Sequence, residues 1–139
     1  MNILGPDPAA ETSPLNRNAQ SVVCRISLGA FDALLTGDVE GPGEEALIRK
    51  LAAGPIDWDV LKVAHHGSNN STAAEFLDLV HPAVSVISAG EGNPYGHPAA
   101  ELLSRLEAGS GNVLRTDKNG AVTVTSDGKR LFFETMKAG

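Results

Sequence analysis

The feature that most constrains the fold is an alternation, in the middle of the chain, between short apolar segments and segments with helical signals. The apolar segments are residues 60–64, 83–88 and 112–115. Short apolar strands that alternate with helices are typical of an α/β layer, because helices cover such a sheet and bury its strands. The sequence therefore predicts an α/β fold.

Three helices are expected around these strands, at residues 43–53, 72–80 and 98–106. The first has glutamates in its first turn and basic residues later, the arrangement that the helix dipole favours. Ser71 is expected to cap the second helix, because a serine hydroxyl satisfies the unpaired N–H groups of a first turn. Pro98 is expected to be the first residue of the third helix, where no backbone N–H is needed.

Antiparallel hairpins are expected at both ends of the folded region, with tight turns at residues 29–30 and 127–128. The paired strands are residues 21–28 with 31–36 and residues 121–126 with 130–135. Residues 1–20 are rich in Pro, Asn, Ser and Thr, and we expect a flexible N-terminal segment with at most one short strand at residues 3–4. Residues 21–139 are expected to form the folded domain.

The charge of the chain narrows its possible functions. With 139 residues and a net charge of −6, its surface is poorly suited to bind nucleic acid by charge alone, because lysine and arginine dominate phosphate binding. A nucleic-acid enzyme is still compatible, since bound metal ions supply positive charge locally. The sequence has no CxxC pair, phosphate-binding glycine loop or GxSxG motif, so zinc-ribbon, nucleotide-loop and serine-hydrolase chemistry is not expected.

Cys24 is the only cysteine, so no internal disulfide is expected. It lies in an apolar run, where we expect a small buried side chain. No apolar run approaches the roughly 20 residues of a membrane-spanning helix, and the first residues lack the pattern of a signal peptide. If the domain belongs to a membrane protein, the membrane part is expected outside this chain.

Side chains suited to metal or proton chemistry follow three of the predicted strands. Asp38 follows one strand, the pair His65-His66 follows the next, and Tyr95 and His97 lie in the loop after the third. In open α/β sheets, ligands bind beyond the carboxyl ends of the strands. Three of the four histidines therefore lie where a functional site is expected.

Each of these residues also has an ordinary structural explanation. An Asp after a strand is often a turn residue. Adjacent histidines at a strand end point in opposite directions, so the two rings do not easily bind one ion, and one buried ring beside one exposed ring is an equally good explanation. His97 is equally well explained as a solvent-facing loop residue. Tyr95 is explained by packing, although its hydroxyl is suited to donate to a substrate oxygen.

Three motifs occur in a fixed order along the chain. They are Leu34-Leu35-Thr36-Gly37-Asp38, then Asp59-Val60-Leu61-Lys62-Val63-Ala64-His65-His66-Gly67-Ser68, then Val86-Ile87-Ser88-Ala89-Gly90 with Asn93-Pro94-Tyr95-Gly96-His97-Pro98. Their order and spacing resemble the ComEC family of DNA-internalisation competence proteins, specifically the C-terminal metallo-β-lactamase-like domain. Two shorter matches fit the same family: Arg115-Thr116-Asp117 with Gly120, and Asn18 with Ser21.

The resemblance implies an α/β fold that is half of a metallo-β-lactamase αββα sandwich, with a mixed sheet, helices on one face and antiparallel hairpins at the ends. The resemblance also implies that the intact domain binds two divalent metal ions, zinc or manganese. It implies that a hydroxide between them attacks phosphorus in single-stranded DNA or another phosphodiester. Asp38 is the implied metal-bridging carboxylate. One of His65 and His66 is the implied metal ligand, with His65 favoured because it directly ends the strand.

The resemblance assigns the other positions to catalysis and substrate. His66 and Ser68 are expected to face the substrate. His97 is expected to stabilise the transition state or to protonate the leaving oxygen. The substrate-binding residues are expected to be Asn69, Ser71 and Tyr95.

One departure from the family pattern changes the expected activity. The main metal motif, HxHxDH or HxDxDH, is absent, and the four histidines of the chain do not replace it. Since a hydrolytic metal site usually has three protein ligands and a water, this chain alone is expected to hold metal weakly and to turn over poorly or not at all. The implied partners are the missing N-terminal half-domain and the channel domain of a bacterial cell-membrane protein.

Two other functions fit the same sequence. A half sandwich exposes an apolar face, and large apolar faces usually mark interfaces. The chain is therefore alternatively a non-catalytic binding or dimerisation module, with a homodimer as one form. The third hypothesis is a stand-alone hydrolase of the same fold that acts on a small phosphoester or lactone.

Overall fold

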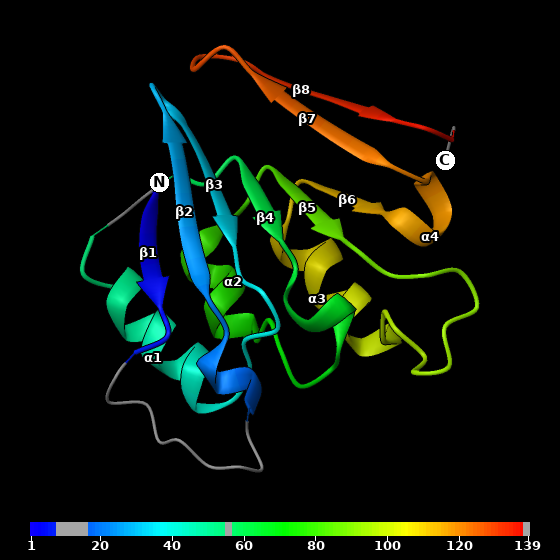
Figure 1. Ribbon diagram of the computed structural model, residues 1–139, viewed down its shortest axis with the longest axis horizontal. Coiled ribbons are helices and arrows are strands. Elements are labelled where there is room, and N and C mark those ends of the chain that lie inside the picture. Colours follow the sequence, from blue (N-terminus) through cyan, green and yellow to red (C-terminus); the bar gives the residue numbers. More distant parts are fainter. Residues whose placement is uncertain (8–16, 55–56, 138–139) are drawn as a thin grey trace.

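The computed structural model describes residues 1–7, 17–54 and 57–137. Within them the chain forms a six-stranded sheet, helices on one face of it, and a separate two-stranded hairpin (Figure 1). In spatial order the sheet contains β1 (Asn2–Gly5), β2 (Val23–Leu28), β3 (Phe31–Leu35), β4 (Val60–Lys62), β5 (Val84–Ile87) and β6 (Asn112–Arg115). The hairpin consists of β7 (Val122–Ser126) and β8 (Leu131–Thr135). The helices are α1 (Pro42–Leu51), α2 (Ala74–Val80), α3 (Ala100–Gly109) and the short α4 (Thr116–Asn119), with 3-10 turns η1 (Arg17–Gln20) and η2 (Ala64–Gly67).

The directions of the strands make this a mixed sheet. β1, β2 and β3 pair antiparallel, and β3, β4, β5 and β6 pair parallel. The parallel half arises from the alternation of strands and helices, so the carboxyl ends of β3, β4 and β5 lie along one edge. The hairpins β2–β3 and β7–β8 stand where antiparallel pairs were expected. The predicted α/β class with a mixed sheet is confirmed.

The core lies between the sheet and helices α1, α2 and α3. Leu34, Leu61 and Ile87 are fully buried residues of β3, β4 and β5. They belong to one cluster with the helix side chains Leu47, Phe76, Leu77, Leu102 and Leu106. Full burial of such a side chain contributes roughly 1.5–3 kcal/mol, so this cluster holds the helices on the sheet.

The start of α2 differs from the expectation. Ser71 does not cap this helix, because its hydroxyl turns toward backbone carbonyls of the preceding loop. The N–H groups of Thr72 and Ala73 donate instead to the carboxylate of Glu44 on α1, at 2.5 and 2.8 Å. Burial raises the pKa of Glu44, while these two hydrogen bonds oppose the shift. A residue on another helix therefore does the capping.

The start of α3 also differs, since Pro98 is not its first residue. α3 begins at Ala100, two residues after Pro98. The peptide bond between His97 and Pro98 is cis. Pro98 packs against Gly67, where an added Cβ would lie 2.5 Å from the proline Cβ. The N–H of Ala99 donates to the Gly67 carbonyl at 2.9 Å. The proline thus joins the loop to η2, and the helix starts after it.

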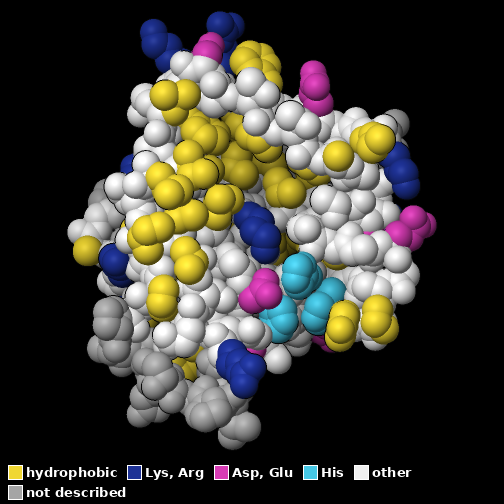
Figure 2. All heavy atoms as spheres, viewed as in Figure 1, with side chains coloured by type: hydrophobic (Ala, Val, Ile, Leu, Met, Phe, Trp, Pro, Cys, Tyr) yellow, Lys and Arg dark blue, Asp and Glu magenta, His cyan; other side chains and the backbone are white. Residues whose placement is uncertain are grey.

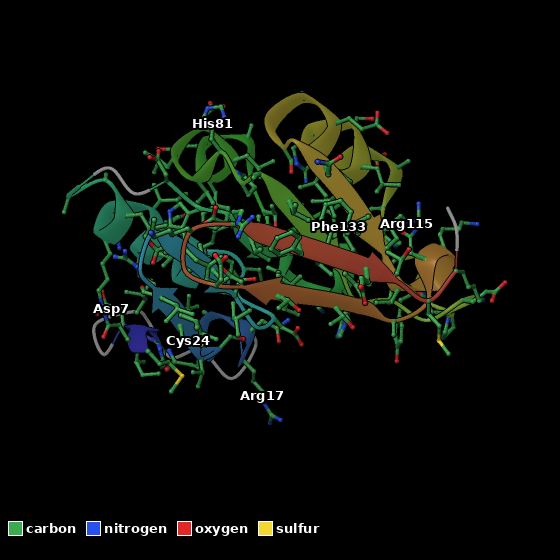
Figure 3. All side chains as sticks on the ribbon, turned by 90° about the horizontal axis from the view of Figure 1, so that it is seen from above. Asp7, Arg17, Cys24, His81, Arg115 and Phe133 are labelled. Carbon is green, nitrogen blue, oxygen red and sulfur yellow. The ribbon has the colours of Figure 1, made fainter. Side chains whose placement is uncertain are left out.

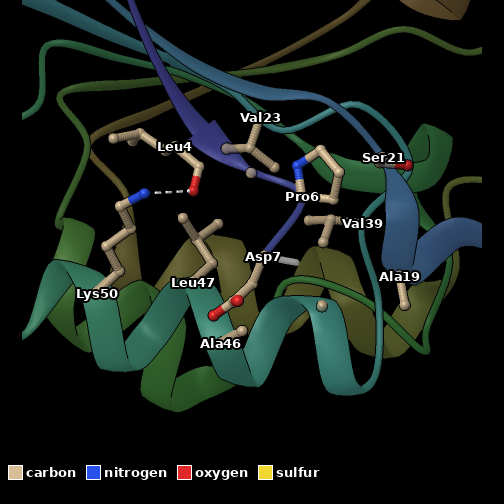
Figure 4. A pocket seen from close by; sticks show the side chains of 12 residues that line it. Leu4, Pro6, Asp7, Ala19, Ser21, Val23, Val39, Ala46, Leu47 and Lys50 are labelled. Atoms are coloured by element: carbon tan, nitrogen blue, oxygen red, sulfur yellow. Dashed lines mark hydrogen bonds between the residues drawn. The ribbon is translucent and has the colours of Figure 1, made fainter. Parts of the chain in front are cut away.

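Part of the N-terminal segment belongs to the sheet. β1 pairs with β2, so the short strand allowed at residues 3–4 is confirmed and is slightly longer than expected. α1 runs beside this strand, and the Lys50 ammonium donates to the Leu4 carbonyl at 2.8 Å (Figure 4). Gly43 permits the close approach of α1 to η1, because a Cβ there would lie 2.5 Å from the carbonyl oxygen of Ala19. The prediction for residues 8–16 lies outside the described residues.

Exposed apolar side chains lie on β2 of the sheet and on β8 of the separate hairpin. Ile26 and Leu28 of β2 are 38% and 55% exposed, and Phe132 and Phe133 of β8 are 52% and 43% exposed. Figure 2 shows such side chains spread between the sheet and the hairpin. Cys24 projects from the side away from the helices (Figure 3) and is only half-buried, so the expectation of a buried cysteine is wrong. This arrangement is compatible with half of a two-layer sandwich.

Candidate functional site

The carboxyl ends of β3, β4 and β5 bring the predicted site residues together. Figure 2 shows histidine side chains gathered in one patch beside an acidic side chain. The ring centroid of His65 lies 5.8 Å from that of His97 and 6.3 Å from that of His66. The Nε2 atom of His66 lies 3.7 Å from Oδ1 of Asp38. Residues far apart in the sequence therefore meet at one edge of the sheet.

Asp38 is presented on a turn that directly follows β3. Gly37 before it has φ 57°, and a Cβ there would lie 3.1 Å from the carbonyl oxygen of Val22, so the turn favours glycine. The Asp38 N–H donates to Oγ of Ser21 at 3.2 Å, which fixes the backbone. The Asp38 side chain is 41% exposed, and its carboxylate accepts no hydrogen bond from the described residues. Its oxygens are thus open to a ligand.

The histidine pair lies in a tight turn and not in a strand. His65 and His66 both have left-handed backbone conformations within η2, with φ 46° and 55°. The expectation that their side chains point in opposite directions is wrong, because that rule holds for extended strands and this turn brings the rings to an edge-on contact. Such conformations cost roughly 1–3 kcal/mol each and cluster at functional sites.

Both histidines of the pair have their Nδ1 atoms occupied by acceptors. Nδ1 of His66 lies 2.8 Å from the carbonyl oxygen of Ser88, and Nδ1 of His65 lies 2.9 Å from Oε2 of Glu40. Since carbonyl and carboxylate oxygens only accept, these contacts favour the tautomer with the hydrogen on Nδ1 and the lone pair on Nε2, although the amide Nδ2 of Asn18 also lies 3.4 Å from Nδ1 of His65. Metal-ligating histidines typically have this arrangement. Both rings are therefore prepared to donate through Nε2.

Glu40 is a site residue that the sequence argument missed. Its Oε1 accepts a hydrogen bond from Nδ2 of Asn18 at 2.9 Å, and its Oε2 holds His65. In the sequence, Asn18 matches only a family motif. In the sequence, Glu40 is a second acidic residue two positions after Asp38. An acidic residue just before a helix is common, so this position alone does not indicate a role in the site.

Lys62 is a second residue that the sequence argument left without a role. Its ammonium donates to the carbonyl oxygens of Gly37 and Val63, both at 3.2 Å, and so connects the ends of β3 and β4. The Gly37 carbonyl also accepts the His65 N–H at 3.1 Å. Burial lowers the pKa of Lys62, and the nearby Asp38 carboxylate opposes this shift. A lysine inside an otherwise apolar strand was the available signal.

His97 and Tyr95 lie on the loop after β5. Their rings stack with centroids 6.1 Å apart and an angle of 23° between the planes. His97 is half-buried, and its Nδ1 is buried without a hydrogen-bond partner among the described residues, which differs from a solvent-facing loop histidine. Tyr95 is 78% exposed, so ordinary packing does not explain it.

The loop after the histidine pair is less accessible than expected. Ser68 and Ser71 are 5% and 2% exposed, and their hydroxyls take part in hydrogen bonds within the loop. Oδ1 of Asn69 accepts from Arg105 of α3 at 2.8 Å, and Arg105 also donates to the carbonyls of Asn69 and Ser71. The two serine hydroxyls are therefore used within the loop, whereas Asn69 is exposed and is held in place by Arg105.

The types of donor atom at this edge suit a divalent ion, but too few of them lie close together among the described residues. Asp38 offers a carboxylate and His66 an imidazole nitrogen 3.7 Å from it, whereas the sequence argument favoured His65 as the ligand. His65 has its Nδ1 held by Glu40 and lies next to both other rings. Among the residues that the structure describes, no three His, Cys, Asp or Glu side chains are close enough to hold a metal ion. A complete centre needs donors beyond these.

The fold and site define the chain as part of an α/β protein with carboxylate and imidazole groups at the carboxyl edge of a mixed sheet. The chain is 41% identical over 117 residues to ComE operon protein 3 of Bacillus subtilis (strain 168). It is 38% identical over 113 residues to competence protein ComA of Neisseria gonorrhoeae and 39% identical over 114 residues to recombination protein 2 of Haemophilus influenzae. These homologues support a competence-protein family for this chain.

The matches cover most of this chain and a small part of each relative. They span 84%, 81% and 82% of the chain, but 14%, 16% and 14% of the respective relatives. No protein-family model matches the sequence. In the described part of the chain, no helix has both the length and the apolar character needed to cross a membrane.

Proposed function

We propose that this chain is the C-terminal half of a metallo-β-lactamase-like, metal-dependent hydrolase domain in a bacterial DNA-uptake protein. Its substrate is a phosphodiester such as single-stranded DNA, and it needs metal donors from outside this chain. The name of one relative, competence protein ComA, supports the DNA-uptake setting. The observation that carries the hydrolase proposal is the pair of histidines held at Nδ1 with Nε2 available, one of them next to Asp38.

In this proposal Asp38 and His66 hold a zinc or manganese ion, and His65 offers a further nitrogen. A divalent ion in a hydrolase supplies Lewis acidity and lowers the pKa of a water toward neutrality. Glu40 and the Ser88 carbonyl keep the two rings oriented, so little reorganisation is needed when an ion or substrate arrives.

Two further residues support the chemistry at this edge. Lys62 connects the ends of β3 and β4 through two carbonyls, and so holds the turn of Asp38 beside the histidine turn. His97 lies 5.8 Å from His65 between ring centroids and is the candidate proton donor to the leaving oxygen.

Cleavage of end-labelled single-stranded DNA tests this proposal. With zinc or manganese, the chain alone is expected to cleave little above background. Joined to the sequence that precedes the matched segment in ComE operon protein 3, it is expected to cleave, and Asp38→Ala is expected to abolish this activity. Asp78→Ala, an exposed acid on α2, is the matched control. Strong cleavage by the chain alone contradicts the incomplete site, and inactivity of the joined protein contradicts the hydrolase.

The open apolar face favours a second candidate function, that of a non-catalytic module that binds a partner or a second copy. Leu28 of β2 and Phe133 of the hairpin are large apolar side chains that are 55% and 43% exposed, and exposed apolar patches often mark interfaces. Light scattering tests it: concentration-dependent dimers that Leu28→Glu and Phe133→Glu dissolve support this function. A monomer at all concentrations contradicts the homodimer.

A further inference from the structure

A pocket of about 300 Å³ lies beside the candidate site and shares a wall with it. It is lined by His66, Asn93, Tyr95, His97 and residues 88–90. No Asp, Glu, Lys or Arg is among these described lining residues, so the pocket is poorly suited to a charged group. Its size is at the lower end of the range for small-ligand pockets. The wall formed by His66 faces both the pocket and the Asp38 carboxylate.

The loop that forms this pocket is held in one conformation by Asn93. Its Nδ2 donates to the carbonyls of Gly90 and His97, at 2.9 and 2.5 Å. Its Oδ1 accepts from the N–H groups of Tyr95 and His97, at 3.2 and 3.1 Å. One side chain thus satisfies four backbone groups, and the position of Tyr95 is set before any ligand binds. Preorganisation of this kind reduces the entropy lost on binding.

Tyr95 is the feature that suggests the ligand. Its ring stacks on His97 and nevertheless remains 78% exposed. A large aromatic ring that the chain orders but does not bury offers a flat surface to another flat ring. Exposed aromatic side chains are the usual platforms for unpaired bases, each contributing stacking that tolerates every base. The absence of charged groups from the lining fits the uncharged ring of a base and not its phosphate.

We propose that this pocket binds one base of single-stranded DNA beside the phosphodiester to be cleaved, with the Tyr95 ring as its stacking platform. The proposal rests on the proposed function and adds a reason for strand selectivity. In a duplex the bases are stacked and paired, and only an extruded base reaches such a pocket. The site therefore prefers single strands through base contacts, in a protein whose net charge of −6 provides little general attraction for DNA.

Equilibrium binding of fluorescent oligothymidylate to the metal-free chain at low salt tests this proposal independently of cleavage. Tyr95→Ala is expected to weaken binding about tenfold or more, and Tyr95→Phe, which keeps the ring, to change it less than about twofold. An abasic oligonucleotide of the same length is expected to bind the wild-type chain as weakly as oligothymidylate binds Tyr95→Ala. A matched duplex is expected to bind no better than the abasic strand.

Several outcomes overturn the proposal. They are equal binding of the abasic strand, an equal loss in Tyr95→Phe and Tyr95→Ala, binding of thymidine monophosphate without binding of the strand, and no binding of the strand at all. The hydrolase proposal is judged separately by the Asp38→Ala cleavage experiment. Base-dependent binding without any cleavage supports the base-binding pocket and contradicts the hydrolase proposal. Cleavage that does not depend on Tyr95 supports the hydrolase proposal and contradicts the base-binding pocket.

Discussion

The two ends of β3 use acidic side chains in opposite ways. Near the amino end, Asp32 is 8% exposed and accepts hydrogen bonds from Arg25 at 2.6 and 2.8 Å and from Ser27 at 2.5 Å. Beyond the carboxyl end, the Asp38 side chain is 41% exposed and lies 3.7 Å from His66, without a hydrogen bond from the described residues. The oxygens of the Asp32 carboxylate are occupied by hydrogen bonds from its neighbours, whereas those of Asp38 are available to a ligand.

This difference separates stability from function along a single strand. A carboxylate whose oxygens are all hydrogen-bonded holds the strands together, and removing it leaves its partners unpaired. An exposed carboxylate without donors contributes little to stability and keeps its acceptors for a ligand. The histidines extend this contrast, since their Nδ1 atoms are used by the fold and their Nε2 atoms are not.

The same substitution at the two ends is expected to have the largest difference in effect. Asp32→Ala is expected to lower the free energy of unfolding by about 2 kcal/mol, because it removes the acceptor of the hydrogen bonds from Arg25 and Ser27. Asp38→Ala is expected to change it by less than about 0.5 kcal/mol. Urea denaturation followed by circular dichroism measures both. Equal destabilisation by the two variants breaks the comparison.

A smaller effect is expected from the residue that orients His65. Glu40→Ala removes the acceptor at Nδ1 and releases the ring, and we expect zinc affinity to fall about tenfold. Glu45→Ala, which removes an exposed glutamate in the first turn of α1, is the matched control and is expected to leave zinc affinity unchanged. Calorimetric titration with zinc compares the three proteins. If Glu40→Ala binds zinc as the wild-type chain does, the orienting role is wrong.

The smallest expected effect is a difference in pH dependence between two carboxylates. Hydrogen bonds from Arg25 lower the pKa of Asp32, so its stabilising contribution is present above its ordinary pKa and is lost as the pH falls through the folded value. Burial raises the pKa of Glu44, so the folded state keeps that proton to higher pH, and stability falls as the pH rises through the raised value.

Urea unfolding across the acidic range checks both signs. Relative to the wild-type chain, Asp32→Asn is expected to lose less stability as the pH is lowered. Glu44→Gln is expected to lose less stability as the pH is raised from the ordinary pKa of a glutamate. Parallel curves for the wild-type chain and either variant contradict the assigned shift.

The sequence predicted the parts of the fold that depend on local pattern. Apolar runs and tight turns located the strands, and motif order predicted that Asp38, His65 and His97 meet at one edge. The cap of α2 was missed because Glu44 lies 28 residues from Thr72 in the sequence. The role of Glu40 was missed because it depends on contact with His65, 25 residues away. The directions of the His65 and His66 rings depend on a left-handed turn that the residue types in the sequence do not predict.

Zinc binding by the chain itself tests the central claim most directly. Calorimetric titration of the wild-type chain is expected to show weak binding that Asp38→Ala and His66→Ala each abolish, because the two side chains present an oxygen and a nitrogen 3.7 Å apart. Asp78→Ala, on the exposed side of α2, is expected to bind as the wild-type chain does. Zinc binding that persists unchanged in Asp38→Ala and His66→Ala would contradict the account.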